Sequence, residues 1–169
     1  MTDWLIIALI AAALVLFWSH RRNRMLGGLP AGDLVSADNE EQECPVLISY
    51  RYGLKGKPDA LVRTKTGAMI PIERKRARAP RRPYDGDLIQ AIAYCVLVED
   101  KYGEPPPYAR IQYADRWFDV SYTPQRKQWA LDVSQRLREA RRAVAVNRSH
   151  GIAGKCRNCA QRENCGQAL

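Results

Sequence analysis

Two neighbouring segments alternate apolar and polar residues around a turn, and this pattern constrains the fold more than any other. The segments span residues 57–64 and 68–75, and the turn between them contains Gly67. Successive side chains of a β-strand point to opposite faces, so the alternation predicts the two arms of a β-hairpin. Similar patterns predict further strands over residues 33–37, 46–51, 108–114 and 117–122.

Two helices are predicted among these strands. Residues 85–101 are rich in Leu, Ile, Ala and Val, and Gly103 and the prolines after it end the helix. A second helix begins after Thr123, with Pro124 in its first position. Its apolar residues recur at helical spacing as far as Val144. At 169 residues the chain is long enough for one domain with appendages.

The N-terminus contains an uninterrupted apolar run. Residues 4–18 read WLIIALIAAALVLFW, which as a helix would measure about 22 Å against a bilayer core of about 30 Å. The run begins and ends with tryptophan, and three arginines follow it closely. It lacks the positive start and the small-residue cleavage site of a signal peptide. We therefore predict an uncleaved transmembrane anchor with its basic flank over residues 1–24; the alternative is a buried core helix.

The arginines after this run also predict its orientation. Cytoplasmic flanks of membrane helices carry excess Lys and Arg, so the remainder of the chain is expected in the cytoplasm, attached to the cell membrane by a single pass. Residues 25–43 contain Gly, Pro and acidic residues and are predicted to be a linker. The globular domain is then expected over residues 44–169.

The charge of the chain suggests a polyanionic partner. Lys and Arg number 27 against 18 acidic residues, a net charge of +9. Such a balance favours nucleic acid or an anionic membrane surface, although a basic soluble protein without such a partner is the alternative. Part of the charge lies in residues 76–83, RARAPRRP, which are predicted to form a loop.

The first hairpin carries the strongest candidate site. Glu73 and Lys75 share one face of their strand, and Asp59 can reach that face from the other arm. Two carboxylates at one point repel each other unless a cation joins them. A hard divalent ion such as Mg2+ accepts carboxylate and carbonyl oxygens, so Asp59, Glu73 and the backbone carbonyl of Arg74 are candidate ligands. Lys75 could hold or activate a water and offset charge on a phosphate. The alternative is an ordinary solvated hairpin.

Pro58-Asp59 followed by Glu73-Arg74-Lys75 resembles the motif of the PD-(D/E)XK nuclease superfamily. The next helix adds Gln90 and Tyr94, which lie four residues apart and so share one face. In the RecB-like branch, such Gln and Tyr residues contact DNA and steady the site. The resemblance implies an α/β, restriction-endonuclease-like mixed sheet flanked by helices. It also implies a metal-dependent deoxyribonuclease that uses Mg2+ or Mn2+.

The cysteines point to a second metal site. Three of the five fall within ten residues of one another, which favours metal or cluster ligation in a reducing compartment. Their spacing, Cys156-x2-Cys159-x5-Cys165, resembles that of CRISPR-associated Cas-four exonucleases, in which one early and three late cysteines hold a structural 4Fe-4S cluster. The resemblance implies Cys44 as the early ligand. A zinc site formed by His150 and the three late cysteines is the alternative. Cys95 is predicted to be a core residue.

One ligand of that family has no counterpart in this sequence. An upstream residue, often His, normally completes the nuclease metal site. The acidic residues that could replace it are Asp38, Glu40, Glu41 and Glu43.

The resemblance therefore implies a nuclease of single-stranded DNA or DNA ends, with exonuclease action. The candidate DNA-binding residues follow the ExK strand and are Arg78, Arg81, Arg82 and Tyr84, with the tyrosine stacking on bases. One alternative is a catalytically inactive nuclease-fold module that binds DNA at the membrane. Another is a membrane-tethered interaction or redox protein built around the cysteines.

Overall fold

The computed structural model describes residues 10–16, 18, 28–37 and 43–169. The chain divides into two compact units, Met1–Leu131 and Asp132–Leu169, which are described separately below.

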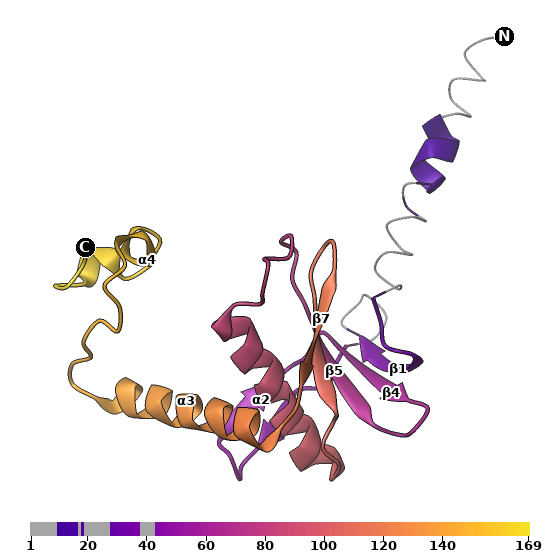
Figure 1. Cartoon of the computed structure of the whole chain (residues 1–169), viewed down its shortest axis with the longest axis horizontal. Coiled ribbons are helices and arrows are strands. Elements are labelled where there is room, and N and C mark those ends of the chain that lie inside the picture. Colours follow the sequence, from indigo (N-terminus) through magenta and orange to yellow (C-terminus); the bar gives the residue numbers. More distant parts are fainter. Residues whose placement is uncertain (1–9, 17, 19–27, 38–42) are drawn as a thin grey trace. The chain divides into compact units, whose positions relative to one another are not determined.

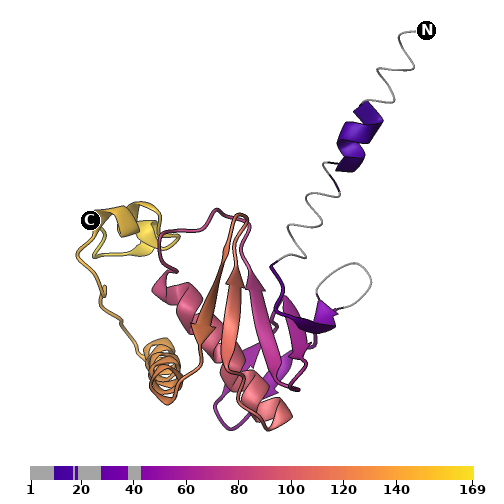
Figure 2. The same cartoon turned by 45° about the vertical axis from the view of Figure 1, so that its right-hand side comes forward.

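A mixed five-stranded sheet forms the centre of the first unit. Its strand order is β1-β4-β5-β6-β7, and only β5 and β6 run parallel. The strands are β1 (Gly32–Ala37), β4 (Ala60–Thr64), β5 (Met69–Arg74), β6 (Tyr108–Gln112) and β7 (Trp117–Ser121). Figures 1 and 2 show them as one twisted layer. The predicted α/β class with a mixed sheet is therefore confirmed.

The helix α2 (Asp85–Tyr102) covers one face of this sheet and joins β5 to β6. Two neighbouring parallel strands need such a crossover, because a tight turn reverses the chain direction and so joins only antiparallel strands. Buried residues of α2, among them Ile92 and the predicted core residue Cys95, pack with Ile111 of β6 and Val120 of β7. The helix ends at Gly103, whose φ of 82° is the left-handed conformation that glycine adopts most easily.

A two-stranded sheet packs against the same helix. It consists of β2 (Leu47–Ser49) and β3 (Leu54–Gly56), and its Leu47 joins a buried cluster with Leu61, Tyr94 and Leu97. The chain then leaves strand conformation over residues 57–59 before β4 begins. The first predicted hairpin arm, residues 57–64, is thus shorter than expected, and Asp59 immediately precedes the strand.

Residues upstream of the predicted domain boundary contribute to the sheet. The predicted short strand over residues 33–37 is β1, which pairs with β4 along the edge of the sheet. On the face opposite α2, Leu29 packs against a buried cluster of Ala37, Ala60, Val62 and Ile72. Arg110 also donates a hydrogen bond of 2.6 Å to the carbonyl of Gly28. Residues 28–37 therefore belong to the domain, although the sequence placed them in a linker over residues 25–43.

The predicted anchor over residues 1–24 lies largely outside the described residues. Residues 10–16 and 18 are helical. Among the residues that the structure describes, none of the helices combines the length and the apolar character needed to cross a bilayer.

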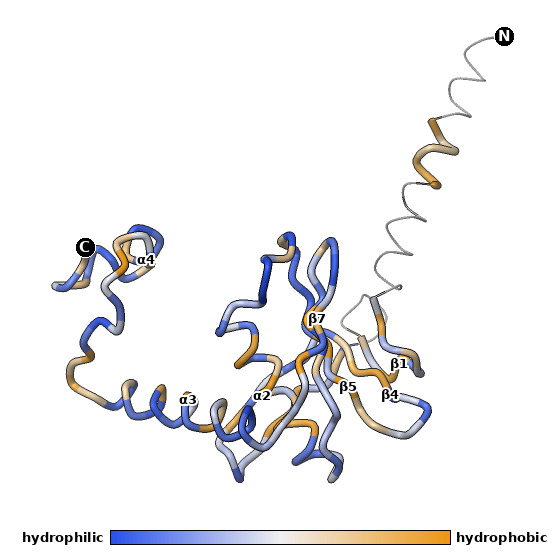
Figure 3. The backbone as a smooth tube through the Cα atoms, in the orientation of Figure 1, coloured by the Kyte–Doolittle hydropathy of each residue, from blue (hydrophilic) through white to orange (hydrophobic). Residues whose placement is uncertain are grey.

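The helix α3 (Pro124–Arg142) starts as predicted. The Thr123 hydroxyl accepts a hydrogen bond of 3.3 Å from the backbone N–H of Arg126, which caps the first turn. Ala130 is the buried residue of α3 and belongs to the core cluster that contains Ile92 of α2, whereas Leu137 is exposed. Figure 3 shows α3 as largely hydrophilic, so the helix presents a smaller buried face than its spacing predicted.

The second unit contains the late cysteines in a closed loop. It includes the short helix α4 (Ala153–Arg157) and a 3-10 turn over Arg162–Asn164. The Gln167 side chain accepts a 2.7 Å hydrogen bond from the backbone of Arg148, and it donates one of 2.8 Å to Asn147. These bonds join the two ends of the segment that carries the cysteines.

Candidate active site

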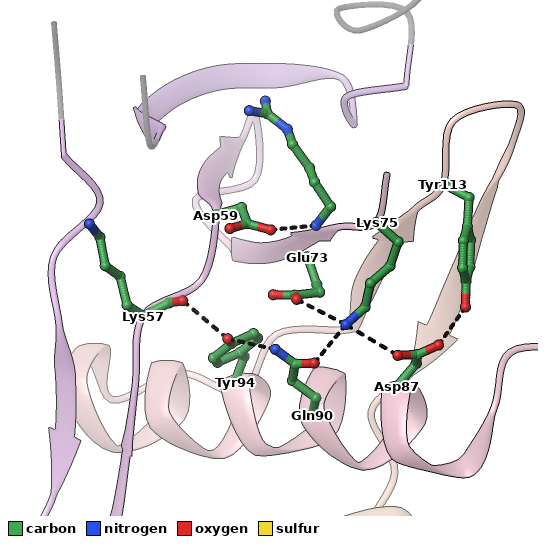
Figure 4. Close-up of polar contacts among 9 residues, drawn as sticks. Lys57, Asp59, Glu73, Lys75, Asp87, Gln90, Tyr94 and Tyr113 are labelled. Carbon is green, nitrogen blue, oxygen red and sulfur yellow. Dashed lines mark hydrogen bonds and ion pairs between the residues drawn. The ribbon is translucent and has the colours of Figure 1, made fainter. Parts of the chain in front are cut away.

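Lys75 is the centre of a polar cluster between the sheet and α2 (Figure 4). It directly follows β5, and its ammonium lies 3.1 Å from a Glu73 carboxylate oxygen. Two residues of α2 also reach it: Asp87 at 3.1 Å, and Gln90, whose side-chain oxygen accepts a hydrogen bond of 2.9 Å. Glu73 and Lys75 share a face because they are two residues apart, and that face is the one that α2 covers.

These neighbours keep Lys75 charged. Burial by itself lowers the pKa of Lys75, but the hydrogen bonds and charges of Glu73 and Asp87 outweigh it and raise the pKa above the ordinary lysine value. The side chain is therefore an ammonium group at neutral pH. It can donate hydrogen bonds and stabilise negative charge, but it cannot accept a proton from water.

Asp59 reaches the same place from the other arm of the hairpin. Its backbone N–H donates to the carbonyl of Ile72 at 3.0 Å, which carries the pairing of β4 and β5 one residue further. Its carboxylate accepts a hydrogen bond of 2.6 Å from the backbone N–H of Arg74. Figure 4 shows the Asp59 and Glu73 carboxylates near one another at the end of β5.

The two carboxylates influence each other electrostatically. Glu73 is 8% exposed, and its pKa is raised first by burial and then by the negative charge of Asp59. Hydrogen bonding to Lys75 and the positive charge of that residue offset part of this rise. A buried acid beside a second acid is stabilised by an additional cation. The pair thus has the electrostatics expected of a divalent-metal site.

The donor set fits a hard divalent ion held by two protein carboxylates. Mg2+ prefers oxygen ligands and commonly keeps several waters, so two carboxylates are a sufficient protein contribution. Among the described residues, no three His, Cys, Asp or Glu side chains gather as a metal centre. Of the four acids considered for the upstream ligand, Glu43 is described, and its carboxylate lies 3.8 Å from the Lys57 ammonium. Asp38, Glu40 and Glu41 lie outside the described residues.

Gln90 and Tyr94 connect α2 to both sides of the site. The Gln90 amide donates to the Tyr94 hydroxyl at 3.0 Å, and that hydroxyl donates to the carbonyl of Lys57 at 3.1 Å. Gly56 allows this approach, because a Cβ at its position would lie 2.8 Å from the Tyr94 ring. The two residues therefore link Lys75 to the segment that leads into Asp59.

Two residues of the cluster were missed by sequence reasoning. Asp87 holds Lys75 and also accepts a hydrogen bond of 2.7 Å from the Tyr113 hydroxyl. Asp87 precedes Gln90 by three residues and Tyr94 by seven, so helical periodicity could have grouped all three on one face. Tyr113 follows β6 and gives no local signal, because only the parallel pairing of β5 and β6 brings it to α2.

The predicted DNA-binding residues lie in the loop that follows Lys75. The guanidinium groups of Arg78, Arg81 and Arg82 are on exposed residues, and Arg78 lies 3.7 Å from the Asp115 carboxylate. Tyr84, directly before α2, is 68% exposed. These side chains are free to contact a ligand that approaches Glu73 and Lys75 from solvent.

The predicted cysteine ligands are divided between the two units. Cys44 is buried in the cluster of Leu47 and Met69, and its sulfur lies 3.2 Å from the Ser36 hydroxyl. In the second unit Cys156 is buried, Cys159 is exposed and Cys165 is intermediate. Among the described residues of the second unit, His150 and the three late cysteines do not gather as a metal centre.

The chain is similar to part of a known protein. No family model matches the chain. A CRISPR-associated exonuclease Cas4/endonuclease Cas1 fusion of Myxococcus xanthus (strain DK1622) is 37% identical over 73 residues, which cover 40% of this chain and 12% of that protein. The crystal structure of SSO0001 overlays on 96% of this chain and 72% of its own, with a TM-score of 0.49 and 14% identity.

Proposed function

We propose that the chain is a metal-dependent deoxyribonuclease of the RecB-like PD-(D/E)XK type, related to Cas4 nucleases. The observation that carries this proposal is the meeting of Asp59, Glu73 and Lys75 at the end of β5. The similarity to a CRISPR-associated exonuclease fusion supports the same reaction class. The α/β fold with a mixed sheet agrees with it.

In the proposed reaction Asp59 and Glu73 would hold Mg2+ or Mn2+. When bound, such an ion polarises a phosphoryl oxygen and lowers the pKa of a coordinated water. Lys75 donates hydrogen bonds to the negative charge that develops on the scissile phosphate. Asp87 and Gln90 keep the ammonium in place for this task. The substrate is a single strand or a DNA end, and cleavage is exonucleolytic.

The alternative is a nuclease-fold module that binds DNA without cleaving it. It is favoured by one observation: the described residues offer two carboxylates to a metal and no third acidic, His or Cys ligand beside them. Binding without cleavage would then be the entire activity of the domain.

The decisive experiment follows the full chain with labelled single-stranded DNA and Mg2+ or Mn2+. We expect cleavage that a chelator abolishes and that Lys75→Ala reduces at least about 100-fold. Lys101→Ala is the matched control, because it removes an exposed lysine in the last turn of α2, at the opposite end of that helix from Asp87. Linear substrates labelled at either end, beside a circular single strand, separate exonuclease from endonuclease action. Metal-independent binding without cleavage would favour the inactive module, and neither binding nor cleavage would contradict both readings.

The cysteines and the N-terminus belong to the proposal as well. We propose that Cys44, Cys156, Cys159 and Cys165 hold a structural 4Fe-4S cluster, with a zinc site including His150 as the alternative. Purification without oxygen followed by metal analysis decides between iron and zinc, and a protein that holds neither contradicts both. The anchor over residues 1–24 is tested by fractionation, where release into the soluble fraction would contradict it.

A further inference from the structure

An exposed basic loop and a neighbouring hairpin turn lie side by side at the end of the sheet where Lys75 is found. The loop comprises residues 76–84 and joins β5 to α2, and the turn comprises residues 113–116 between β6 and β7. Both views show them adjacent (Figures 1 and 2). We refer to the loop and the turn together as the basic arm.

Several hydrogen bonds attach the loop backbone to the turn. The Asp115 carboxylate accepts a bond of 2.7 Å from the N–H of Ala79. The N–H of Ala114 donates to the carbonyl of Ala77 at 3.1 Å. The Arg116 guanidinium donates to the carbonyl of Pro80 at 2.5 Å. A connecting loop needs no such bonds, and each one restricts the conformations of an otherwise solvated segment.

Asp115 is the centre of this attachment. Its hydrogen bond from Ala79 lowers the pKa of its carboxyl, so the group is ionised at neutral pH. Its contact with Arg78, at 3.7 Å, involves a side chain that is 89% exposed and contributes little by itself. The main contribution of Asp115 is therefore to the conformation of the loop rather than to the neutralisation of an arginine.

The arm combines positive charge with the exposed aromatic ring of Tyr84. No acidic residue occurs between Arg74 and Tyr84. Its exposed arginines are Arg76, Arg78, Arg81, Arg82 and Arg116. Tyr84 is 68% exposed. Arginines that contact phosphates, together with aromatic rings that stack on bases, are the usual composition of a surface for single-stranded nucleic acid.

The loop of the basic arm also begins and ends beside the candidate active site. Residue 76 directly follows Lys75, and Tyr84 precedes the first turn of α2, which carries Asp87. A strand whose phosphates lie on the arm would thus enter at Glu73 and Lys75.

We propose that the basic arm binds the sugar–phosphate backbone of a single DNA strand and that Asp115 is a positioning residue that holds the arm in its binding conformation. This proposal rests on the proposed nuclease function and names the surface that delivers the substrate. Arg116 joins the binding residues expected from the sequence. The arginines contact phosphates without reading the base sequence.

The proposal makes a prediction that simple electrostatics does not. Asp115→Ala makes the chain more positive, so an unstructured basic loop would bind DNA as tightly as before or more tightly. If Asp115 holds the arm in its binding conformation, the Asp115→Ala variant should bind DNA more weakly, because the arginines lose their common arrangement. We expect about a threefold to tenfold weaker affinity for Asp115→Ala, in spite of the added positive charge.

The experiment measures fluorescence anisotropy of labelled oligo-dT with the full chain in EDTA, over a series of salt concentrations. Arg81→Ala/Arg82→Ala should weaken binding about tenfold and lower the slope of log K against log salt by about 1.4. Asp100→Ala is the matched control for Asp115→Ala, since it removes an exposed acid from α2 outside the arm. Circular dichroism verifies that each variant is folded.

The outcomes separate this proposal from the proposed function. Unchanged or tighter binding by Asp115→Ala overturns the positioning role. If the native chain binds and cleaves DNA while the arginine variant binds DNA equally well, the proposed role of the arm is wrong and the nuclease function stands. If the native chain neither binds nor cleaves DNA, both are wrong. If the arginine variant loses binding to phosphatidylserine vesicles but keeps its DNA binding, the arm binds lipid and the proposal is overturned.

Discussion

Lys75 is held between two carboxylates from different elements, and this arrangement decides what its side chain can do. Glu73 lies near the end of β5, which Lys75 directly follows, whereas Asp87 comes from α2 and is itself held by Tyr113. The Lys75 side chain is 25% exposed, so both ion pairs are only partly solvated. Removing one partner leaves the other charges less well compensated. The proposed electrostatic role of Lys75 therefore depends on a residue outside the ExK motif.

We expect Asp87→Asn to lower kcat about tenfold with a smaller change in KM, because Lys75 would pair with Glu73 alone and shift from its position. Asparagine retains an acceptor for Tyr113, so the fold should persist. Kinetics on labelled single strands measure the effect, and Asp85→Asn, in the same first turn of α2, is the control. Equal kcat in both variants would rule out a positioning role for Asp87.

At the scale of elements, α2 joins most of the first unit. Its middle contacts the main sheet, and its Glu99 accepts hydrogen bonds from Tyr122, which follows β7, and from Lys127 of α3, the latter at 2.7 Å. The Lys127 ammonium also lies 5.2 Å from the centre of the Tyr52 ring, in the turn between β2 and β3. One carboxylate thus connects the end of α2 with the beginning of α3.

This connection should make stability depend on pH. Burial raises the pKa of Glu99, but the hydrogen bonds from Lys127 and Tyr122 outweigh burial and lower the pKa below its ordinary value of 4.5. A lowered pKa in the folded state stabilises the protein above the ordinary value, and the stabilisation is lost as the pH falls through the folded pKa. We expect Glu99→Gln to reduce the free energy of unfolding by about 1–2 kcal/mol at neutral pH.

The difference between the native protein and Glu99→Gln should shrink below about pH 4. Urea unfolding at neutral and acidic pH measures it, with the exposed Glu104→Gln as control. A difference that stays constant over this range would show that the charge of Glu99 contributes nothing.

At the scale of the whole molecule, the first unit begins upstream of the boundary that composition suggests. β1 hydrogen-bonds along β4, and Leu29 covers the sheet face opposite α2. Arg110 is 7% exposed and is satisfied by Asp119 and by the carbonyl of Gly28. Removing residues 28–37 would expose apolar surface and take one acceptor from a buried guanidinium.

We therefore expect a fragment of residues 44–169 to melt at least about 10 °C below a fragment of residues 28–169, or not to fold. The longer fragment keeps β1, Leu29 and the Gly28 carbonyl, so it is the matched control. Thermal circular dichroism of both fragments makes the comparison. Equal melting temperatures would place the start of the stable domain at residue 44.

The sequence alone predicted those features that depend on residues close together in the chain. The alternation around Gly67, the helix that ends at Gly103 and the Thr123 cap are set by neighbouring residues, through backbone conformation and side-chain periodicity. The same local logic placed Glu73 beside Lys75, and Gln90 beside Tyr94. Composition did not reveal β1 as part of the sheet, since its four exposed positions resemble those of a linker.

The remaining features were decided by contacts between distant segments. Parallel pairing of β5 and β6 brings Tyr113 to Asp87, and packing of α2 on the sheet brings Asp87 to Lys75. The hydrogen bond from Arg110 to Gly28 joins residues 82 positions apart. A sequence pattern carries the period of each element but not the register or face on which two elements meet. Those are chosen by burial of apolar surface and satisfaction of polar groups in the folded chain as a whole, which is why the complete surroundings of Lys75 emerge only in the tertiary structure.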